Sequence, residues 1–175
     1  MTEIEIPNGV ECKLNGEEIS FKGKFGSTVK RFNSKFCKVS VNGSKINVEH
    51  SKVSKKIEKV AALAETSLSS QINSAIKGVS NGIERKMQLV FAHFPITLEQ
   101  KGKTVLIKNI FGERYPRSVK IYGDTKIEAK GQDVNVKGAD VYDVNQSIAN
   151  IRKACSSWGK DTRVFQDGLY AVKEE

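Results

Sequence analysis

Features that define several common classes of protein are scarce in this sequence. Its three cysteines, Cys12, Cys37 and Cys155, are odd in number and lack the paired CxxC spacing of zinc sites. We therefore expect reduced thiols, without a disulfide framework or a metal site. No apolar run approaches the roughly 20 residues that span a membrane. The opening MTEIEIPNGV is acidic and alternating, unlike a signal peptide. These absences predict a soluble, intracellular protein with no membrane partner.

Catalytic residues are equally scarce. The two histidines, His50 and His93, have no nucleophile or ligand at a recognisable spacing, and His93 in AHFPI is typical of a packed structural side chain. The segment FKGKFGST does not fit the GxxxxGK[ST] spacing of a phosphate-binding loop. Its GxxG, residues 23–26, matches the nucleotide-clamping loop of KH domains, but that loop joins helices and the flanks here alternate like strands. The KH interpretation stays a minor alternative, and the sequence predicts no enzyme and no cofactor.

Acidic residues are missing from two segments of a chain whose formal net charge is +9. No Asp or Glu occurs between Ile19 and Val48, and Glu113 is the only acid between Gln100 and Gly123. The basic residues of these segments are Lys22, Lys24, Lys30, Arg31, Lys35, Lys38 and Lys45, and then Lys101, Lys103, Lys108, Arg114, Arg117 and Lys120. Because a solvated surface usually mixes both signs, segments of one sign favour a polyanionic partner, above all nucleic acid.

The sequence also contains an internal repeat. VECKLNGEEISFKGKFG, from residue 10, aligns with ITLEQKGKTVLIKNIFG, from residue 96, and VSVNGSKINV, from residue 39, aligns with VKIYGDTKIEA, from residue 119. The alignment places Gly16 on Gly102, Gly26 on Gly112 and Gly43 on Gly123. We therefore predict two tandem copies of one unit, residues 1–82 and residues 83–175.

Hydrophobic periodicity assigns the elements of each copy. Alternation predicts strands at 10–14, 19–24, 38–41, 45–48, 83–92, 96–99, 105–109, 119–122, 126–129, 134–136 and 169–172. Residues 26–32 are expected to be a flexible basic segment. A period of three to four residues predicts one helix that stops at Gly78 and another capped by Asp140. Their apolar stripes are Ile57, Val60, Ala61, Ala64, Leu68, Ile72, Ala75 and Ile76, and then Val141, Val144, Ile148, Ile151, Ala154 and Cys155. The fold class is α+β, each copy an antiparallel β-sheet packed against one long α-helix.

Residues 109–117, NIFGERYPR, form the best candidate for a binding site. Gly112 permits close backbone approach, Arg114 and Arg117 suit phosphates, and Tyr115 could stack on a base or sugar. The alternative is a solvated connection, but the clustered basic charge favours binding. In the tail, Lys160 and Arg163 flank Asp161, which could form a local ion pair or orient an arginine toward RNA.

Four segments, taken in order, resemble one family. They are IEIPNGVECKLNGEEISFKGKFGSTVKRF near the start, GVSNGIERKMQLVFAHFPI from residue 78, NIFGERYPRSVKI from residue 109 and DTRVFQDGLYAV from residue 161. Together they resemble the large-subunit ribosomal protein six family, called ninth in the eukaryotic count, over nearly the whole chain. RVFQDGLY is similar to the archaeal and eukaryotic branch, and the lack of long basic extensions suggests an archaeal member.

The resemblance implies a non-enzymatic, cytoplasmic constituent of the large ribosomal subunit with two similar α+β domains. It implies binding to rRNA near the sarcin–ricin region and the translation-factor site, mainly through the C-terminal domain. Ser118, Pro116 and residues 83–85 depart from the family pattern. With Lys160 added from the tail, the rRNA-binding candidates are Lys86, Met87, Asn109, Gly112, Glu113, Arg114, Tyr115, Arg117, Lys160, Asp161, Arg163, Gln166, Asp167 and Gly168.

The implied partners are large-subunit rRNA and neighbouring ribosomal proteins, with translation GTPases close by. The alternative is a free-standing basic RNA-binding protein, such as a regulator or an RNA chaperone. An RNA-modifying enzyme is disfavoured because the sequence contains no acid–base or nucleophile set.

Overall fold

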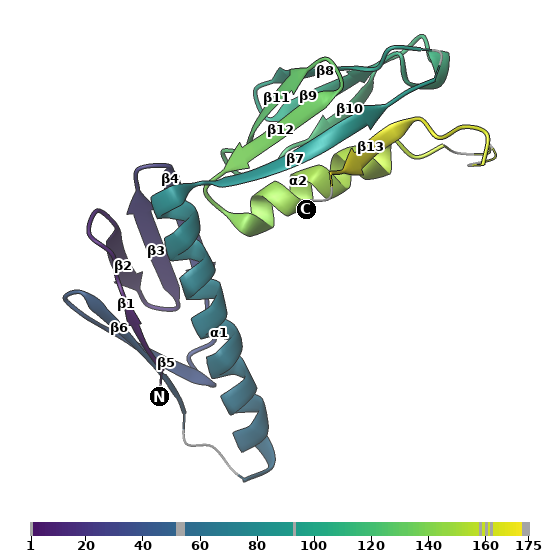
Figure 1. Ribbon diagram of the computed structural model, residues 1–175. Helices are drawn as coiled ribbons and strands as arrows, with labels where there is room; N and C mark the ends of the chain where they lie inside the picture. Colours follow the sequence, from purple (N-terminus) through teal and green to yellow (C-terminus); the bar gives the residue numbers. More distant parts are fainter. Residues whose placement is uncertain are drawn as a thin grey trace. The chain divides into compact units, whose positions relative to one another are not determined.

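The computed structural model describes residues 2–51, 55–92, 94–157, 159, 161 and 163–172. The chain divides into two compact units, Met1–Gly82 and Ile83–Glu175. In Figure 1 the first unit runs from purple to teal and the second from teal through green to yellow.

The N-terminal unit contains two antiparallel three-stranded sheets and a helix. The first sheet has the order β1 (Thr2–Glu5), β6 (Lys45–His50), β5 (Cys37–Asn42). The second has the order β2 (Glu11–Asn15), β3 (Glu18–Gly23), β4 (Gly26–Arg31). Helix α1 (Lys55–Asn81) packs on strands of both sheets. Alternate residues of β3 and β6 face this core and are fully buried: Ile19, Phe21, Ile46 and Val48.

The C-terminal unit repeats this plan and adds a strand. One sheet has the order β11 (Lys126–Lys130), β12 (Asp133–Gly138), β7 (Ile83–Val90), β13 (Gly168–Ala171). The other has the order β10 (Arg117–Lys120), β9 (Thr104–Lys108), β8 (Thr97–Lys101). A short 3₁₀ turn, η1 (Ile110–Gly112), follows β9, and helix α2 (Val141–Ala154) follows β12. The core includes Met87, Leu89, Ile107, Val134, Val136, Val144, Ile148 and Ile151.

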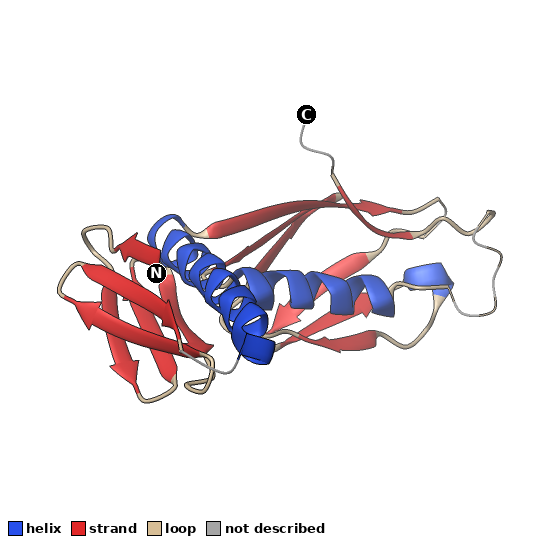
Figure 2. Ribbon diagram, turned by 90° about the horizontal axis from the view of Figure 1, so that it is seen from below, coloured by secondary structure: helices blue, strands red, loops and turns tan. Residues whose placement is uncertain are grey.

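The strand orders confirm the predicted duplication. In chain order, each unit has six strands followed by a helix: β1 to β6 and α1 in the first unit, and β7 to β12 and α2 in the second. The sheet β1-β6-β5 then matches β7-β12-β11, and β2-β3-β4 matches β8-β9-β10. Figure 2 shows in each unit one long helix, in blue, laid against red strands. The α+β class is therefore confirmed, and β13 is the element that the C-terminal copy adds.

The second half of the internal sequence alignment, however, is wrong. Gly43 lies in the turn between β5 and β6, whereas Gly123 lies between β10 and β11. The topological equivalent of Gly43 is Gly131, in the turn between β11 and β12. All three glycines adopt a positive φ, of 60°, 58° and 62°. The alignment therefore detected a shared turn chemistry, the left-handed backbone that glycine tolerates, and not an equivalent position.

Three element assignments also need correction. Residues 26–31 form strand β4 and not a flexible segment. In this strand the polar Thr28 faces inward and the apolar Val29 is 52% exposed, which is the reverse of the usual alternation. The short strand β1 was not predicted, because Ile4 is its one buried residue. Helix α1 passes through Gly78 and ends at Asn81, where the N–H of Gly82, with a φ of 74°, donates to the carbonyl of Gly78.

The predicted apolar stripes are mostly buried. On α1, Ala61, Leu68, Ile72, Ala75 and Ile76 are buried, but Val60 is 51% exposed. The side chain of Ile57 lies outside the described residues. On α2, the buried members are Val144, Ile148, Ile151 and the following Cys155. Val60 therefore does not belong to the stripe that faces the sheets.

The predicted cap of α2 is present. One carboxylate oxygen of Asp140 accepts a hydrogen bond from the backbone N–H of Tyr142 at 2.9 Å. We expect Asp140→Ala to lower the free energy of unfolding by about 1 kcal/mol, because a backbone donor of the first turn loses its acceptor. Urea denaturation measures the change, with Asp124→Ala, an exposed loop aspartate, as the control. Equal losses in both variants would assign the effect to charge and not to capping.

Candidate nucleic-acid interface

Three connections of the C-terminal unit meet at one place. They are residues 91–92 and 94–96 before β8, residues 109–116 between β9 and β10, and the described part of the tail before β13. The side-chain amide of Asn109 donates to the carbonyl of Pro95 at 3.2 Å, which joins the first two connections. The carboxylate of Asp167 accepts from the backbone N–H of Ala92 at 3.0 Å, which joins the first to the tail. Asn109 and Asp167, both candidates from the sequence, therefore hold the loops together.

Aromatic rings pack where these connections meet. Phe111 and Phe165 lie edge to face, with ring centroids 6.4 Å apart and an interplanar angle of 78°. A β-carbon added at Gly112 would lie 3.2 Å from the ring of Phe94. Gly112 therefore leaves room for the ring of Phe94 inside the unit, whereas its close approach to RNA stays a prediction. Neither Phe94 nor Phe165 was a candidate, because nothing in their local sequence signals these contacts.

The backbone of η1 is strained. Asn109 has a φ of 61° and Phe111 a φ of 51°, and among the described residues these are the only non-glycine positions with positive φ. A bulky residue in this region costs on the order of 1–3 kcal/mol and persists only where surrounding contacts hold it. Here the ring of Phe111 contacts both Phe165 and the guanidinium of Arg117, whose centre lies 5.8 Å from the ring centroid. Strain of this kind is typical of functional loops.

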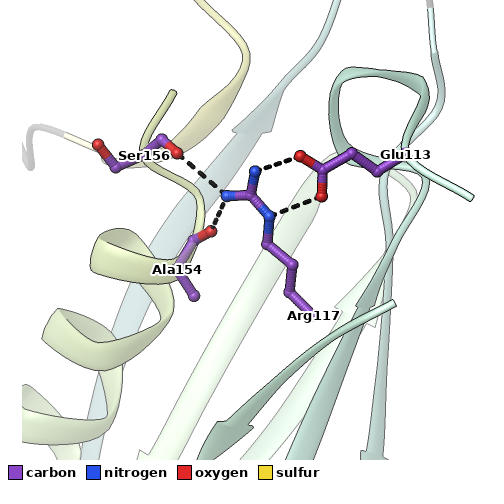
Figure 3. A network of polar contacts seen from close by, with 4 residues as sticks. All are labelled: Glu113, Arg117, Ala154 and Ser156. Carbon is purple, nitrogen blue, oxygen red and sulfur yellow. Dashed lines mark hydrogen bonds and ion pairs between the residues drawn. The ribbon is translucent and has the colours of Figure 1, made fainter. Parts of the chain in front are cut away.

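Arg117 and Glu113 form an internal ion pair, which Figure 3 shows from close by. Nε of Arg117 donates to Oε2 of Glu113 at 2.8 Å, and Nη2 donates to Oε1. Nη1 donates to the carbonyls of Ala154 and Ser156, the latter at 3.0 Å. The Arg117 side chain is 25% exposed, and the hydrogen bonds to Glu113 raise its pKa above the ordinary arginine value. Two predicted rRNA-binding residues are thus engaged with each other.

Other candidates project into solvent. Tyr115 is 82% exposed, and Arg114 is exposed beside it without an ion pair to the described residues. In the tail, Arg163 and Gln166 are exposed. Asp161 accepts a hydrogen bond from the backbone N–H of Arg163 at 2.9 Å, so it shapes the local turn. The exposed groups are therefore two guanidiniums, a phenol ring and an amide, a set suited to phosphates and bases.

The remaining candidates lie elsewhere in the unit. Lys86 is exposed on β7, whereas Met87 is 4% exposed and packs in the core. Gly168 is buried at the start of β13. Lys160 lies outside the described residues. Lys86 is accessible to solvent, and the buried Met87 packs in the core beneath the same strand.

The corresponding connection in the N-terminal unit is shorter. Arg117 pairs with Ile107 across β10 and β9, and Thr28 pairs with Phe21 across β4 and β3. Nine residues separate the first pair along the chain and six separate the second, so the C-terminal connection is longer by three. In the N-terminal turn, Lys24 lies 5.9 Å from the centre of the Phe25 ring. The longer arginine-bearing loop is thus a property of the C-terminal copy.

The thiols offer no site of their own. Cys12, Cys37 and Cys155 are free, and the last two are buried. Burial raises the pKa of Cys155 to about 11, against the opposing effect of the nearby Arg117 guanidinium. This thiol is therefore neutral and unreactive near pH 7.

Within the described ranges, no group of three or more His, Cys, Asp or Glu residues is placed to hold a metal ion. No helix in that part of the chain is long and apolar enough to cross a membrane.

The fold and this cluster define a basic, duplicated α+β protein whose C-terminal copy presents an arginine-bearing loop. Residues 94–168 match the family model of ribosomal protein L6. This range contains every residue of the loop contacts described above, apart from Ala92. The chain is 36% identical to large ribosomal subunit protein uL6 of Methanobrevibacter smithii, over 99% of this chain and 95% of that protein. It is 37% identical to uL6 of Methanococcus vannielii, over 98% and 92%, and 37% identical to uL6 of Methanosarcina mazei, over 98% and 95%.

This chain therefore belongs to the ribosomal protein L6 family. The family resemblance expected from the sequence is confirmed, and these relatives come from archaea, the branch that was predicted. Proteins of this family are structural and are not enzymes.

Proposed function

We propose that this protein is a structural constituent of the large ribosomal subunit, in the cytoplasm, and that it binds and braces rRNA. Membership of the L6 family supports the ribosomal role, and the net charge of +9 supports a nucleic-acid partner. The observation that carries the proposal is the loop cluster of the C-terminal unit. It combines exposed Arg114, Tyr115 and Arg163 with a backbone fixed by internal contacts.

The mechanism is phosphate neutralisation together with recognition of RNA shape. Arg114 and Arg163 offer planar guanidiniums that pair with phosphate oxygens and release counterions from the RNA. Tyr115 offers an exposed ring on which an unstacked base or a sugar can pack. Because the loop backbone is already ordered by Asn109 and its neighbours, little conformational entropy is lost on binding. No chemical step is required, which agrees with a bracing role.

The finer assignment follows the family resemblance. We propose that residues 83–175 are the main rRNA-binding unit and that they bind near the sarcin–ricin region, close to the site where translation GTPases act. Residues 1–82 then serve as a spacer or as a surface for neighbouring ribosomal proteins. The longer arginine-bearing connection of the C-terminal copy supports this division of labour.

A sucrose gradient tests the ribosomal role directly. We expect nearly all of the cellular protein to co-sediment with large subunits and to remain there in high salt, because an integrated constituent makes many contacts at once. A protein found mostly at the top of the gradient would instead favour a free-standing RNA-binding regulator or chaperone.

Chemical footprinting of the rRNA tests where on the rRNA the protein binds. Protection that depends on this protein is expected at the sarcin–ricin region, and protection confined to other helices would contradict the finer assignment.

A further inference from the structure

We propose that Arg117 is a positioning residue, which together with Glu113 holds the β9–β10 connection in its RNA-binding shape without contacting phosphate. This inference rests on the proposed rRNA-binding function of the same loop. It also separates Arg117 from Arg114, although the sequence alone makes the two arginines look equivalent.

The hydrogen-bond donors of Arg117 are nearly used up within the protein. A guanidinium carries five N–H donors. Two of them bond to the carboxylate of Glu113, and Nη1 bonds to the carbonyls of Ala154 and Ser156. A phosphate that bound Arg117 bidentately would have to displace partners that already satisfy the same geometry.

The local charge also disfavours a phosphate at Arg117. The carboxylate of Glu113 neutralises the guanidinium, and its own negative charge would repel a phosphate placed beside it. Arg114 lies next in the chain, is exposed and makes no ion pair with the described residues. The positive potential available to RNA therefore comes from Arg114 and not from the paired Arg117.

The pair closes the exposed part of the loop. Glu113 and Arg117 are four residues apart and bracket Arg114, Tyr115 and Pro116. Their contact fixes both ends of this tripeptide, so the exposed side chains project from a closed loop. Ordering the loop before binding reduces the entropy lost when RNA binds.

The same guanidinium anchors this loop to the rest of the C-terminal unit. The carbonyl of Ala154 belongs to the last residue of α2, where helix carbonyls lack partners within the helix, and Ser156 begins the tail. The guanidinium also lies against the ring of Phe111, whose backbone is strained. One side chain therefore links the loop, the end of α2 and the tail.

The N-terminal copy supplies an internal comparison. At the register position of Arg117 it has Thr28, and its shorter turn has no counterpart of the bracketed tripeptide. The clamp and the loop that it closes therefore occur together in one copy and are both missing from the described turn of the other. This is expected if the clamp exists to hold the loop.

The test uses full-length protein and two RNA probes, a sarcin–ricin-domain transcript and full-length large-subunit rRNA. Arg117→Met keeps the apolar stem over Phe111 but removes the donors, and Glu113→Gln removes the charge of the partner. We expect each variant to bind rRNA roughly tenfold more weakly, with an unchanged log–log salt slope, because no phosphate contact is lost. The double variant should be little worse than either single one. Arg114→Ala, the control, should reduce the slope by about one unit.

Glu113→Gln separates the two roles by the sign of its effect. If Arg117 bound phosphate, freeing it from its carboxylate would tighten RNA binding, and Arg117→Met would reduce the salt slope by about one unit. Either result would overturn the proposal.

Amide hydrogen exchange in the RNA-free protein supplies an independent measurement. The amides of residues 110–115 should exchange several-fold faster in both clamp variants, while those of α2 stay protected. Unchanged exchange would show that the pair does not hold the loop, and would also overturn the proposal. If even the unaltered protein bound neither RNA, the proposed function would fail, while the exchange result would still decide whether the clamp orders the loop.

Discussion

Leu68→Ala is expected to lower the free energy of unfolding by about 2–5 kcal/mol. Leu68 lies on the face of α1 that packs against the sheets of the N-terminal unit, and it is 5% exposed. Truncation removes buried apolar contacts and leaves a cavity that the surrounding residues fill incompletely. The side chain already borders an open pocket of about 160 Å³ lined in part by Phe32 and Phe36, which the substitution would enlarge.

Leu63→Ala is the matched control for this experiment. Leu63 lies on the same helix, five residues earlier, and is 71% exposed. The two substitutions make the same chemical change and alter helix propensity equally, so their difference isolates burial. Urea denaturation should show Leu63→Ala within about 0.5 kcal/mol of the unaltered protein. Similar losses at both positions would show that the face of α1 carrying Leu68 does not form the core of this unit.

The regular part of the fold could be predicted because the sequence alternates where a strand has one buried face. Ile19 and Phe21 on β3, and Ile46 and Val48 on β6, show this pattern and are fully buried. Strand β4 reverses it, because a threonine faces inward and a valine outward, so hydrophobicity alone could not identify the strand. A buried hydroxyl in a strand depends on partners from elsewhere in the fold, and a local pattern does not contain them.

The candidate site was predictable to a similar degree. Composition made this loop a candidate, because arginines, a glycine and a tyrosine cluster there, and Arg114 and Tyr115 are exposed in it. Its role as a binding site stays a prediction. Composition could not separate the two arginines. Arg117 donates to backbone carbonyls that lie 37 and 39 residues further along the chain. Every residue has a backbone carbonyl, so the sequence does not indicate which of them will accept these hydrogen bonds. The resemblance to a family likewise marks positions without stating which of them contact RNA and which support those that do.

Duplication suggests a physical reason for the proposed division of labour. Both copies inherit the same strand order and a basic segment, but the C-terminal copy also has a longer β9–β10 connection, the clamp that closes it and strand β13. The tail that leads into β13 meets the same cluster of loops through the contact of Phe165 with Phe111, and Arg163 lies two residues before Phe165. These additions give the C-terminal copy two exposed guanidiniums, those of Arg114 and Arg163, on separate segments.

The combined substitution Arg114→Ala and Arg163→Ala is expected to weaken binding to large-subunit rRNA by about 30- to 1,000-fold, since each lost charge-assisted contact costs roughly 1–2 kcal/mol. The log–log salt slope should fall by somewhat under two units, because two phosphates keep their counterions. Titrations at several salt concentrations measure both quantities.

The matched change is Lys30→Ala with Arg31→Ala in the N-terminal copy. It removes the same charge from β4, where Arg31 already donates to Glu18 at 2.6 Å. We expect it to reduce affinity less than the C-terminal pair does, and to reduce the salt slope by under one unit. Because both double variants have the same net charge, a general loss of electrostatic attraction would weaken binding equally in the two. A larger loss of rRNA affinity from the Lys30 and Arg31 pair would contradict the proposal and would make the N-terminal copy the main rRNA-binding unit. The longer loop of the C-terminal copy would then serve something other than rRNA affinity.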